Sequence, residues 1–361
     1  MTPPEAASPP PPQGGAASGP AKPVPRRPLG RTKLPRRALH GVLLLDKPLG
    51  WTSNDALQKA KWLLRAEKAG HTGTLDPLAT GLLPLCFGAA TKFSQISLDA
   101  DKAYRATLAL GRSSSTGDLE GELSVPVPVQ ITAEQVHAVL ASFTGRISQL
   151  PPMYSALKKD GRALYEYARA GIELERTPRE VLVHQISLVQ WQGEQLVLDV
   201  HCSKGTYIRT LAEDIGGALG CGAHLAALRR TASGPLSLAR AVSLEALEAL
   251  DESARLALML PVDSLLADWP ALALDEAEAA RFLTGLRRRV QHPDCAALKV
   301  YGPTRHRFLG SGHVLAGELI ADRLLSPAEV AAMAPDLPAM TVAPPPPITA
   351  PAAAEQAELN S

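Results

Sequence analysis

The sequence predicts an α/β protein of the α+β type, with helices flanking a mixed, largely antiparallel sheet. Apolar runs with strand character at 39–45, 82–87 and 104–110 are separated by amphipathic stretches with helical character. These elements follow one another without a regular strand-helix-strand repeat, which argues against a purely parallel sheet. At 361 residues the chain is long enough for two or three domains with substantial cores.

The first predicted elements are a buried strand and a helix. Residues 39–45 are rich in leucine and polar at one position only, as expected for a buried strand. Ser53 is a suitable N-cap for a helix that runs through Leu64 and places Leu57 and Ala60 on the same face. The sequence therefore predicts an amphipathic helix directly after the strand.

The remaining elements of the main domain are predicted from the same periodicities and from turn residues. In order, they are a strand at 82–87, a helix at 91–98, a strand at 104–110, a polar connection at 111–121, a helix at 132–143 with a Thr-x-x-Gln capping box, two strands within 181–200 around a Gln192-Gly193 turn, and a strand end passing into a helix at 206–219.

The two ends of the chain differ in composition from the middle. Residues 1–38 are rich in Pro, Ala and Gly and carry clustered Lys and Arg, so they bury too little apolar area to offset their ordering entropy. We expect a disordered cationic tail there, and favour a solvated tail over one that contacts RNA phosphates. A second disordered tail is expected at 336–361, while the rest divides into a main domain at 39–260 and a small C-terminal domain at 261–328.

Composition limits the environment of the protein. The net charge of +1 gives no overall positive field that would attract nucleic acid, so any nucleic-acid binding must depend on local clusters of basic residues. The four cysteines are widely scattered, no export signal is recognisable, and no apolar run approaches the ~18 to 20 residues needed to cross a bilayer. We expect a cytoplasmic protein with reduced thiols and no membrane association.

The loop G-H-T-G-T-L-D-P-L-A-T-G is the most unusual stretch of the sequence. Gly70, Gly73 and Gly81 allow positive φ or close backbone approach, and Pro77 restricts the residue before it. Asp76 is therefore expected to be held in one orientation. Taken alone, the pattern favours an ordinary Asp-Pro turn over a catalytic aspartate.

The segment 151–171 mixes aromatic and basic residues. Such interleaving suits single-stranded RNA, because rings stack on bases and cations meet phosphates. From residues alone, an amphipathic helix with a solvated basic face fits equally well. The residues concerned are Tyr154, Lys158, Lys159, Arg162, Tyr165, Tyr167 and Arg169.

Several long motifs, taken together, resemble one family. In order along the chain they are G-V-L-L-L-D-K-P (41–48), S-N-D-A-L-Q-K (53–59), G-H-T-G-T-L-D-P-L-A-T-G (70–81), A-T-K-F-S-Q (90–95), K-A-Y-R (102–105), P-P-M-Y-S-A-L-K (151–158), L-Y-E-Y-A-R (164–169), H-C-S-K-G-T-Y-I-R-T (201–210) and C-G-A-H-L (221–225). In order and spacing, over roughly residues 39 to 245, they resemble the TruB-type tRNA pseudouridine synthases.

This resemblance implies a fold and an activity. It implies the pseudouridine synthase fold with the active cleft across the middle of the sheet, an RNA-contacting insertion at about 150–180, and a PUA-like C-terminal domain, for which the match is weak. The activity would be isomerisation of the uridine at position 55, in the T loop of tRNA, to pseudouridine, with the base flipped out of its stack. The resemblance also implies the tRNA T arm as partner, no cofactor, and a monomer.

The resemblance further assigns roles to individual residues. Asp76 would be catalytic, either as a nucleophile at the sugar or as a base on a glycal route, and both remain open. Tyr104 would stack on the flipped uracil, although as a lone strand aromatic it would be assigned to the core. Tyr207 and Arg209 would line the pocket, with Arg209 paired to Asp76 so that the ionised carboxylate is favoured. Leu228 would be an apolar pocket residue, where a lone leucine would otherwise be assigned to the core.

Three further positions complete the comparison with the family. His71 matches a histidine that helps hold the flipped-out RNA, and we do not assign it as general base. Lys47 is expected to shape the pocket floor. Ser114 stands where a threonine is common in the family, and we expect this difference not to touch the site.

Two alternatives to this interpretation were considered. A metal site at Cys221 and His224, or at His201 and Cys202, matches no common zinc spacing, so we expect no bound metal. A tRNA-folding chaperone or RNA-binding module acting without catalysis would also use the aromatic and basic segment at 151–171. An inactive variant that still supports tRNA refolding would distinguish the two functions.

Overall fold

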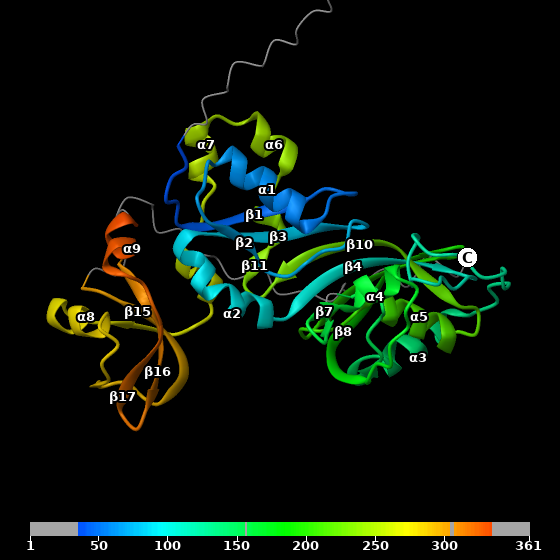
Figure 1. The fold of residues 1–361 in the computed structure, drawn as a ribbon. Coiled ribbons are helices and arrows are strands. Elements are labelled where there is room, and N and C mark those ends of the chain that lie inside the picture. The colour runs from blue at the N-terminus through cyan, green and yellow to red at the C-terminus, as the bar shows by residue number, and fades with distance from the viewer. Residues whose placement is uncertain (1–34, 156, 304–306, 334–361) are drawn as a thin grey trace, which may run out of the picture. The chain divides into compact units, whose positions relative to one another are not determined.

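The structure is a computed structural model that describes residues 35–155, 157–303 and 307–333. The predicted tail at 336–361, and residues 1–34 of the predicted N-terminal tail, lie outside these described residues. Within them, a ten-stranded sheet and a separate five-stranded sheet account for most of the strands (Figure 1).

The large sheet confirms the predicted architecture. Its neighbours pair antiparallel except for β1 with β12 and β3 with β10, so it is mixed and largely antiparallel. β2 (Ala69–His71) pairs with β3 and β11 (Leu236–Ser237) pairs with β10. The order across the sheet is β12 (Val242–Ser243), β1 (Gly41–Lys47), β3 (Ala79–Phe87), β10 (Ala223–Ser233), β4 (Lys102–Leu110), β9 (Gln195–Cys202), β8 (Arg179–Gln192) and β5 (Gly145–Gln149).

Strand β1 lies between two apolar layers, which explains why consecutive residues in its sequence are apolar. Leu43 and Leu45 pack with α1 (Ser53–Leu63) and α6 (Leu244–Ala249), whereas Val42 and Leu44 pack into a different apolar cluster on the other side. A strand covered on both faces has no solvent-exposed side to alternate with. The leucine-rich sequence at 39–45 follows from this position.

The start of α1 differs from the prediction. Thr52, not Ser53, is the N-cap, and its hydroxyl accepts a hydrogen bond from the Asp55 amide at 3.1 Å. The Ser53 hydroxyl instead donates to the Leu75 carbonyl at 3.0 Å and accepts from the Leu75 amide at 2.7 Å. Ser53 therefore ties the helix to the loop at 70–81 rather than capping the helix.

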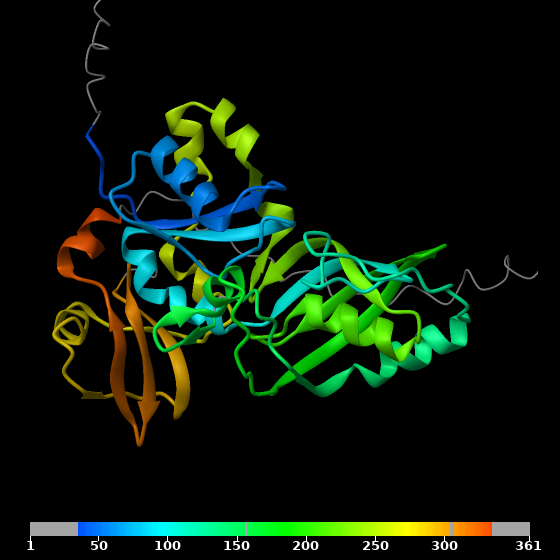
Figure 2. The same cartoon turned by 45° about the vertical axis from the view of Figure 1, so that its right-hand side comes forward.

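Helices cover one face of β4, β9 and β8 and form a second core. Tyr104, Ala106, Leu108 and Leu110 alternate along β4 toward this core, as predicted from their spacing. α3 (Ala133–Ser142) and α5 (Ile208–Ala218) supply the other wall and lie against the same side of the sheet (Figures 1 and 2).

Several local predictions are confirmed. Helix α3 begins with the complete capping box, in which the Thr132 hydroxyl accepts from the Gln135 amide and the Gln135 side chain accepts from the Thr132 amide. Strands β8 and β9 pair around the turn at Gly193. The predicted helix at 91–98 is a 3-10 helix, η1 (Gly88–Phe93), followed by α2 (Ser94–Asp99).

Beyond the large sheet the chain forms smaller units. The predicted insertion contains the hairpin β6 (Lys158–Lys159) and β7 (Arg162–Ala163) and the helix α4 (Leu164–Arg169). After α7 (Glu252–Ala257) and the 3-10 helix η3 (Val262–Leu266) comes the five-stranded sheet, in the order β13 (Ala271–Ala273), β15 (Cys295–Tyr301), β16 (Phe308–Leu315), β17 (Glu318–Leu324) and β14 (Arg288–Arg289), with α8 (Glu276–Phe282) and α9 (Pro327–Ala332).

The described residues contain no helix that is both long enough and apolar enough to span a membrane.

Candidate active site

A cavity of about 280 Å³ lies where the loop at 70–81, strands β4 and β10 and the start of α5 meet. Asp76, Tyr104, Tyr207, Arg209 and Leu228 all line it. Five of the seven residues proposed from the sequence are therefore brought together, although they come from four separate parts of the chain. Thr74, Leu75, Ala79, Tyr154, Ser155, Thr206 and Ile208 complete the lining.

Backbone conformation holds the loop that carries Asp76. Gly73 has φ +87° and Gly81 has φ +96°, and a Cβ on Gly81 would lie 2.4 Å from the Arg230 carbonyl oxygen. Both positions therefore need glycine. At Gly70 the prediction was wrong, because φ is not positive there and a Cβ would meet nothing within 4 Å.

The buried guanidinium of Arg230 anchors the same loop. Its Nη2 donates to the Gly73 carbonyl at 3.0 Å and its Nε donates to the Leu82 carbonyl at 2.7 Å. The Asp76 carbonyl in turn accepts from the Ala79 amide at 3.0 Å. With the two Ser53 bonds to Leu75, these contacts fix the backbone on both sides of Asp76.

Asp76 is oriented toward Arg209 at the wall of the cavity. Arg209 Nη2 lies 3.1 Å from Asp76 Oδ2, and the Asp76 side chain is 50% exposed while that of Arg209 is 10% exposed. The carboxylate therefore keeps one side open to a ligand while its counter-ion is largely enclosed.

Arg209 is itself held by a second aspartate, Asp118. Arg209 Nη1 lies 3.3 Å from Asp118 Oδ2, and the Asp118 side chain is only 4% exposed. Asp118 Oδ1 accepts from the Thr116 hydroxyl at 2.6 Å and from the Glu120 amide at 3.1 Å. The Tyr154 carbonyl accepts another bond from Arg209, so the guanidinium is fixed from three directions.

The two tyrosines of the cavity sit on rigid elements. Tyr104 lies on β4, and burial raises the pKa of its phenol, partly offset by the neighbouring Arg230 guanidinium. Tyr207 is the N-cap residue of α5, where the buried Gln149 side chain accepts from its amide at 3.0 Å and donates to its carbonyl at 3.3 Å. Burial also raises the pKa of Tyr207. Both rings therefore remain neutral over the usual working pH range.

Leu228 forms the apolar part of the cavity wall through the sheet register. It lies on β10 opposite Ala79 of β3 on one side and Ala106 of β4 on the other. Two alanine neighbours leave space above the strands, and the leucine side chain fills part of it.

His71 and Lys47 do not line the cavity. His71 ends β2, its Nδ1 is buried without a hydrogen-bond partner, and burial lowers its pKa, with Arg230 adding to the effect. Lys47 is buried at the end of β1, where its Nζ donates to the carbonyls of Pro48 and Trp51. Burial lowers the pKa of Lys47 to about 8, and the nearby negative charge of Asp76 offsets part of this shift.

Sequence reasoning missed three residues that shape the site. Asp118 and Arg230 are buried charges whose partners lie far away in the chain, so no local spacing reveals them. Ser114 does not line the cavity, in line with the prediction, but its hydroxyl donates to the Asp118 carbonyl and so supports the site indirectly. The one indication in the sequence is the polar run S-S-S-T-G-D at 113–118, which by its composition predicts only a turn-rich connection.

Neither cysteine-histidine pair considered as a metal site is assembled. Cys221 is buried in the second core, while the Nδ1 of His224 pairs with the Arg112 carbonyl at 2.9 Å. His201 and Cys202 are consecutive residues on β9, so their side chains point to opposite faces of the sheet.

Three family models match consecutive parts of the chain. The model described as TruB family pseudouridylate synthase (N terminal domain) matches residues 61–208. The model for the tRNA pseudouridylate synthase B C-terminal domain matches 209–267, and the model described as Pseudouridine synthase II TruB, C-terminal, matches 270–325. All five cavity residues proposed from the sequence fall within the first two matches.

Curated relatives cover most of the chain. The chain is 60% identical to the tRNA pseudouridine synthase B of Verminephrobacter eiseniae, over 84% of this chain and 94% of that protein. It is 56% identical to the tRNA pseudouridine synthase B of an Azoarcus species, over 81% of this chain and 97% of that protein. The chain therefore spans nearly the full length of these relatives.

Solved structures share the fold at lower sequence identity. A chain in the crystal structure of a Cbf5-Nop10-Gar1 complex is similar with a TM-score of 0.62 and 25% identity, over 81% of this chain and 87% of that chain. A chain in the archaeal box H/ACA sRNP Nop10-Cbf5 complex is similar with a TM-score of 0.60 and 24% identity, over 80% of this chain and 86% of that chain. The second likeness concerns the fold alone.

Proposed function

The chain belongs to the TruB family of pseudouridine synthases, and we propose that it isomerises a uridine in the T loop of tRNA to pseudouridine, with Asp76 acting at the ribose. Membership confirms the family and the pseudouridine synthase fold predicted from the motifs. The chain is an isomerase, and relatives of 54 to 60% identity carry the name tRNA pseudouridine synthase B. The pairing of a half-exposed Asp76 with an enclosed Arg209 supports the proposed site.

The cavity supports each requirement of this reaction. An extruded uracil needs a stacking surface, and Tyr104 and Leu228 offer an aromatic and an apolar one in the cavity that Asp76 also lines. The ribose then lies next to the open side of the carboxylate. Arg209 keeps a positive charge beside Asp76, so that the carboxylate acts in its ionised form.

Two routes from this arrangement conserve atoms and electrons. In the first, an Asp76 oxygen attacks C1′ while the bond from C1′ to N1 breaks and uracil leaves with the electron pair; uracil then turns, C5 bonds to C1′, the carboxylate departs, C5 loses its proton and N1 gains one. In the second, Asp76 removes the C2′ proton as uracil leaves with the electron pair of the bond to N1; C5 then bonds to C1′ of the glycal as C2′ regains a proton, C5 loses its proton and N1 gains one. Neither route consumes a cofactor.

Incubation of the protein with an unmodified tRNA transcript, followed by site-resolved pseudouridine mapping, tests the proposal. Wild type should modify one T-loop uridine, and Asp76→Asn should reduce the rate by about 10³-fold or more, because amide nitrogen and oxygen serve neither route. Asp199→Asn is the matched control, since Asp199 is a half-exposed aspartate paired with Arg105. Equal activity of wild type and Asp76→Asn would refute the assignment.

The exposed aromatic and basic segment supports a second candidate role in tRNA folding. Arg162 lies over the Tyr167 ring at 4.8 Å and Arg169 lies over the Tyr165 ring at 5.4 Å, and the Tyr165 amide donates to the carbonyl of the cavity residue Ser155. We propose that this insertion, at about 150–180, contacts tRNA. If the Asp76→Asn protein supported tRNA refolding and growth as fully as the wild-type protein does, RNA binding rather than chemistry would be the main role.

We also propose the division of the chain and its working state. The separate five-stranded sheet supports a main domain at 39–260 and a small PUA-like domain at 261–328. Since the described part of one chain supplies the whole cavity lining, we propose that the enzyme acts as a monomer, which light scattering at working concentration tests. We place this activity in the cytoplasm, where its tRNA substrate is available; cell fractionation tests this.

A further inference from the structure

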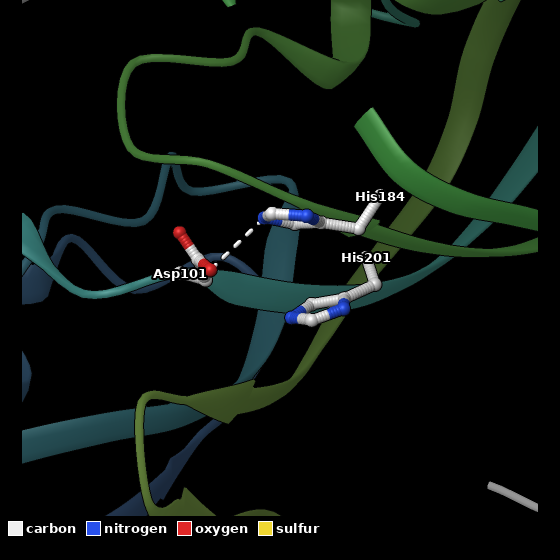
Figure 3. A group of neighbouring side chains, drawn as sticks. All are labelled: Asp101, His184 and His201. Carbon is white, nitrogen blue, oxygen red and sulfur yellow. Dashed lines mark ion pairs between the residues drawn. The ribbon is translucent and has the colours of Figure 1, made fainter. Parts of the chain in front are cut away.

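A group of three side chains on neighbouring strands has no role in the proposed reaction. Asp101 immediately precedes β4, His201 lies on β9 opposite Ala103, and His184 lies on β8 where the register shifts between Val183 and Gln185 (Figure 3). The shift places one extra residue on β8 at this point, which turns the His184 side chain toward its neighbours. Far apart in the sequence, the three residues are adjacent in the sheet.

The distances within this group suit a shared ligand. His184 Nε2 lies 2.9 Å from Asp101 Oδ2, and the imidazole rings of His184 and His201 lie 4.7 Å apart between centroids with an interplanar angle of 33°. One ligand atom from each of the three side chains lies within 4.8 Å of the other two. Figure 3 shows both rings extending toward the aspartate from adjacent strands.

The group lies on the opposite face of the sheet from the cavity. On β9, Val200 is opposite Tyr104 and is buried in the core with α5, so the next residue, His201, points to the other face. On β8, Val183 is fully buried in the same core, whereas the side chain of His184 is 33% exposed. Any ligand held here would therefore be separate from the nucleoside.

We propose that Asp101, His184 and His201 bind one divalent transition-metal ion of the zinc class on this face of the sheet. Two imidazoles and one carboxylate are a donor set that such ions accept, with the remaining position left for water. Tetrahedral Zn²⁺ with bonds of about 2.0 to 2.2 Å places its ligand atoms roughly 3.3 to 3.6 Å apart. The ligand atoms already lie within 4.8 Å of one another, so shifts of about 1 Å would bring them to that spacing.

The role of such an ion would be to link three strands of the large sheet. It would join the beginning of β4, which carries Tyr104 three residues after Asp101, to the paired strands β8 and β9. An ion that binds the folded chain and not the unfolded one raises the free energy of unfolding by RT ln(1 + c/Kd), where c is the ion concentration, so the unfolding temperature rises with ion concentration.

A histidine-aspartate pair elsewhere in the chain is a matched control. His313 Nδ1 lies 2.9 Å from Asp322 Oδ1 across β16 and β17, with exposure similar to that of His184 and Asp101. Within the described ranges, no second triad of His, Cys, Asp or Glu side chains comes as close together as Asp101, His184 and His201. His313 therefore keeps the contact with an aspartate while lacking the second imidazole.

The test uses the full chain after removal of metal with a chelator. Titration of Zn²⁺ against a competing chromophoric chelator should show one equivalent bound, and His184→Ala and His201→Ala should each weaken binding by about 100-fold. Asp101→Asn should also weaken it, whereas His313→Ala should have no effect. Circular dichroism of each variant checks folding, and activity on tRNA without metal should be unchanged by all of them.

Cobalt supplies a second, spectroscopic measurement of the same site. Co²⁺ bound by two imidazoles and a carboxylate should give visible absorption without a thiolate charge-transfer band. His201→Ala should abolish this visible absorption. Cys295→Ser is carried alongside, because Cys295 Sγ lies 3.9 Å from His292 Nδ1 and is a possible thiol ligand. The proposal fails if wild type binds no stoichiometric Zn²⁺, or if His313→Ala or Cys295→Ser reduces binding as much as His201→Ala.

Discussion

Two aspartates lie at opposite ends of one guanidinium, and their surroundings differ sharply. Asp76 is 50% exposed at the cavity wall and meets Arg209 at 3.1 Å. Asp118 is 4% exposed, meets Arg209 at 3.3 Å, and also accepts bonds from Thr116 and Glu120. The same arginine therefore makes one ion pair that water reaches and one that water does not.

The difference shows how one residue type serves two purposes. A carboxylate with an open side and one counter-ion is free to meet a substrate, and its ion pair contributes little to folding. A buried carboxylate with both oxygens hydrogen-bonded stabilises the position of the guanidinium, and removing either partner leaves an uncompensated charge. We infer that Asp118 orients Arg209 and that Arg209 in turn orients Asp76.

Arg209→Gln removes both ion pairs at once and should have the largest effect on stability. We expect the free energy of unfolding to fall by about 3 to 5 kcal/mol, because Asp118 stays buried without its cation. Activity should fall by about 100-fold or more, since the charge beside Asp76 is lost. Denaturant midpoints and single-turnover rates on tRNA measure the two effects.

Arg105→Gln is the control for that change. Arg105 pairs with Asp199 through two hydrogen bonds, but the side chains are 52% and 45% exposed. Its loss should lower the unfolding free energy by no more than about 1 kcal/mol. If Arg105→Gln destabilised the protein as much as Arg209→Gln, burial would not be what distinguishes the two ion pairs.

Asp118→Asn and Asp76→Asn each remove one of the two ion pairs of Arg209, so their effects can be compared. Asp118→Asn should reduce the unfolding free energy by about 3 kcal/mol and activity by about 10-fold to 100-fold, because the guanidinium loses its fixed position. Asp76→Asn should change stability by less than about 1 kcal/mol while abolishing turnover. Chemical denaturation gives the unfolding free energy of each variant, and turnover assays give its activity. Equal stability of the two variants would contradict the comparison.

The same contrast explains what could be predicted from the sequence. Strand and helix positions follow from periodic apolar residues, and Asp76, Tyr104 and Arg209 follow from contiguous motifs that resemble a family. Asp118 could not be recognised in the same way, because its role depends on a partner that folding brings across from α5.

The sequence alone also does not predict which residue caps α1, or which motif residues reach the cavity surface. Thr52 and Ser53 are both suitable caps, and only the position of Leu75 decides that Ser53 bonds to the loop. His71 and Lys47 belong to matching motifs, yet neither lines the cavity. A motif identifies a neighbourhood of the active site, while the sheet register decides which side chains reach its surface.

Lys47 sharpens the comparison because it is buried like Asp118 but faces the charge of Asp76. Burial lowers its pKa to about 8, compared with about 10.4 for an unfolded lysine. Between these values the folded chain holds fewer protons than the unfolded chain, so stability rises with pH and the full penalty is present below pH 8. Relative to Lys47→Met, the unfolding free energy of wild type should therefore gain about 2 kcal/mol between pH 7 and pH 9.5.

The reference variant isolates this lysine from other groups that titrate in the same range. Lys47→Met cannot donate to the carbonyls of Pro48 and Trp51, but that loss is the same at every pH. The measurement is the difference between the two urea-unfolding free energies at each pH. A constant difference would mean that Lys47 keeps an ordinary pKa, and that the charge of Asp76 compensates its burial fully rather than in part.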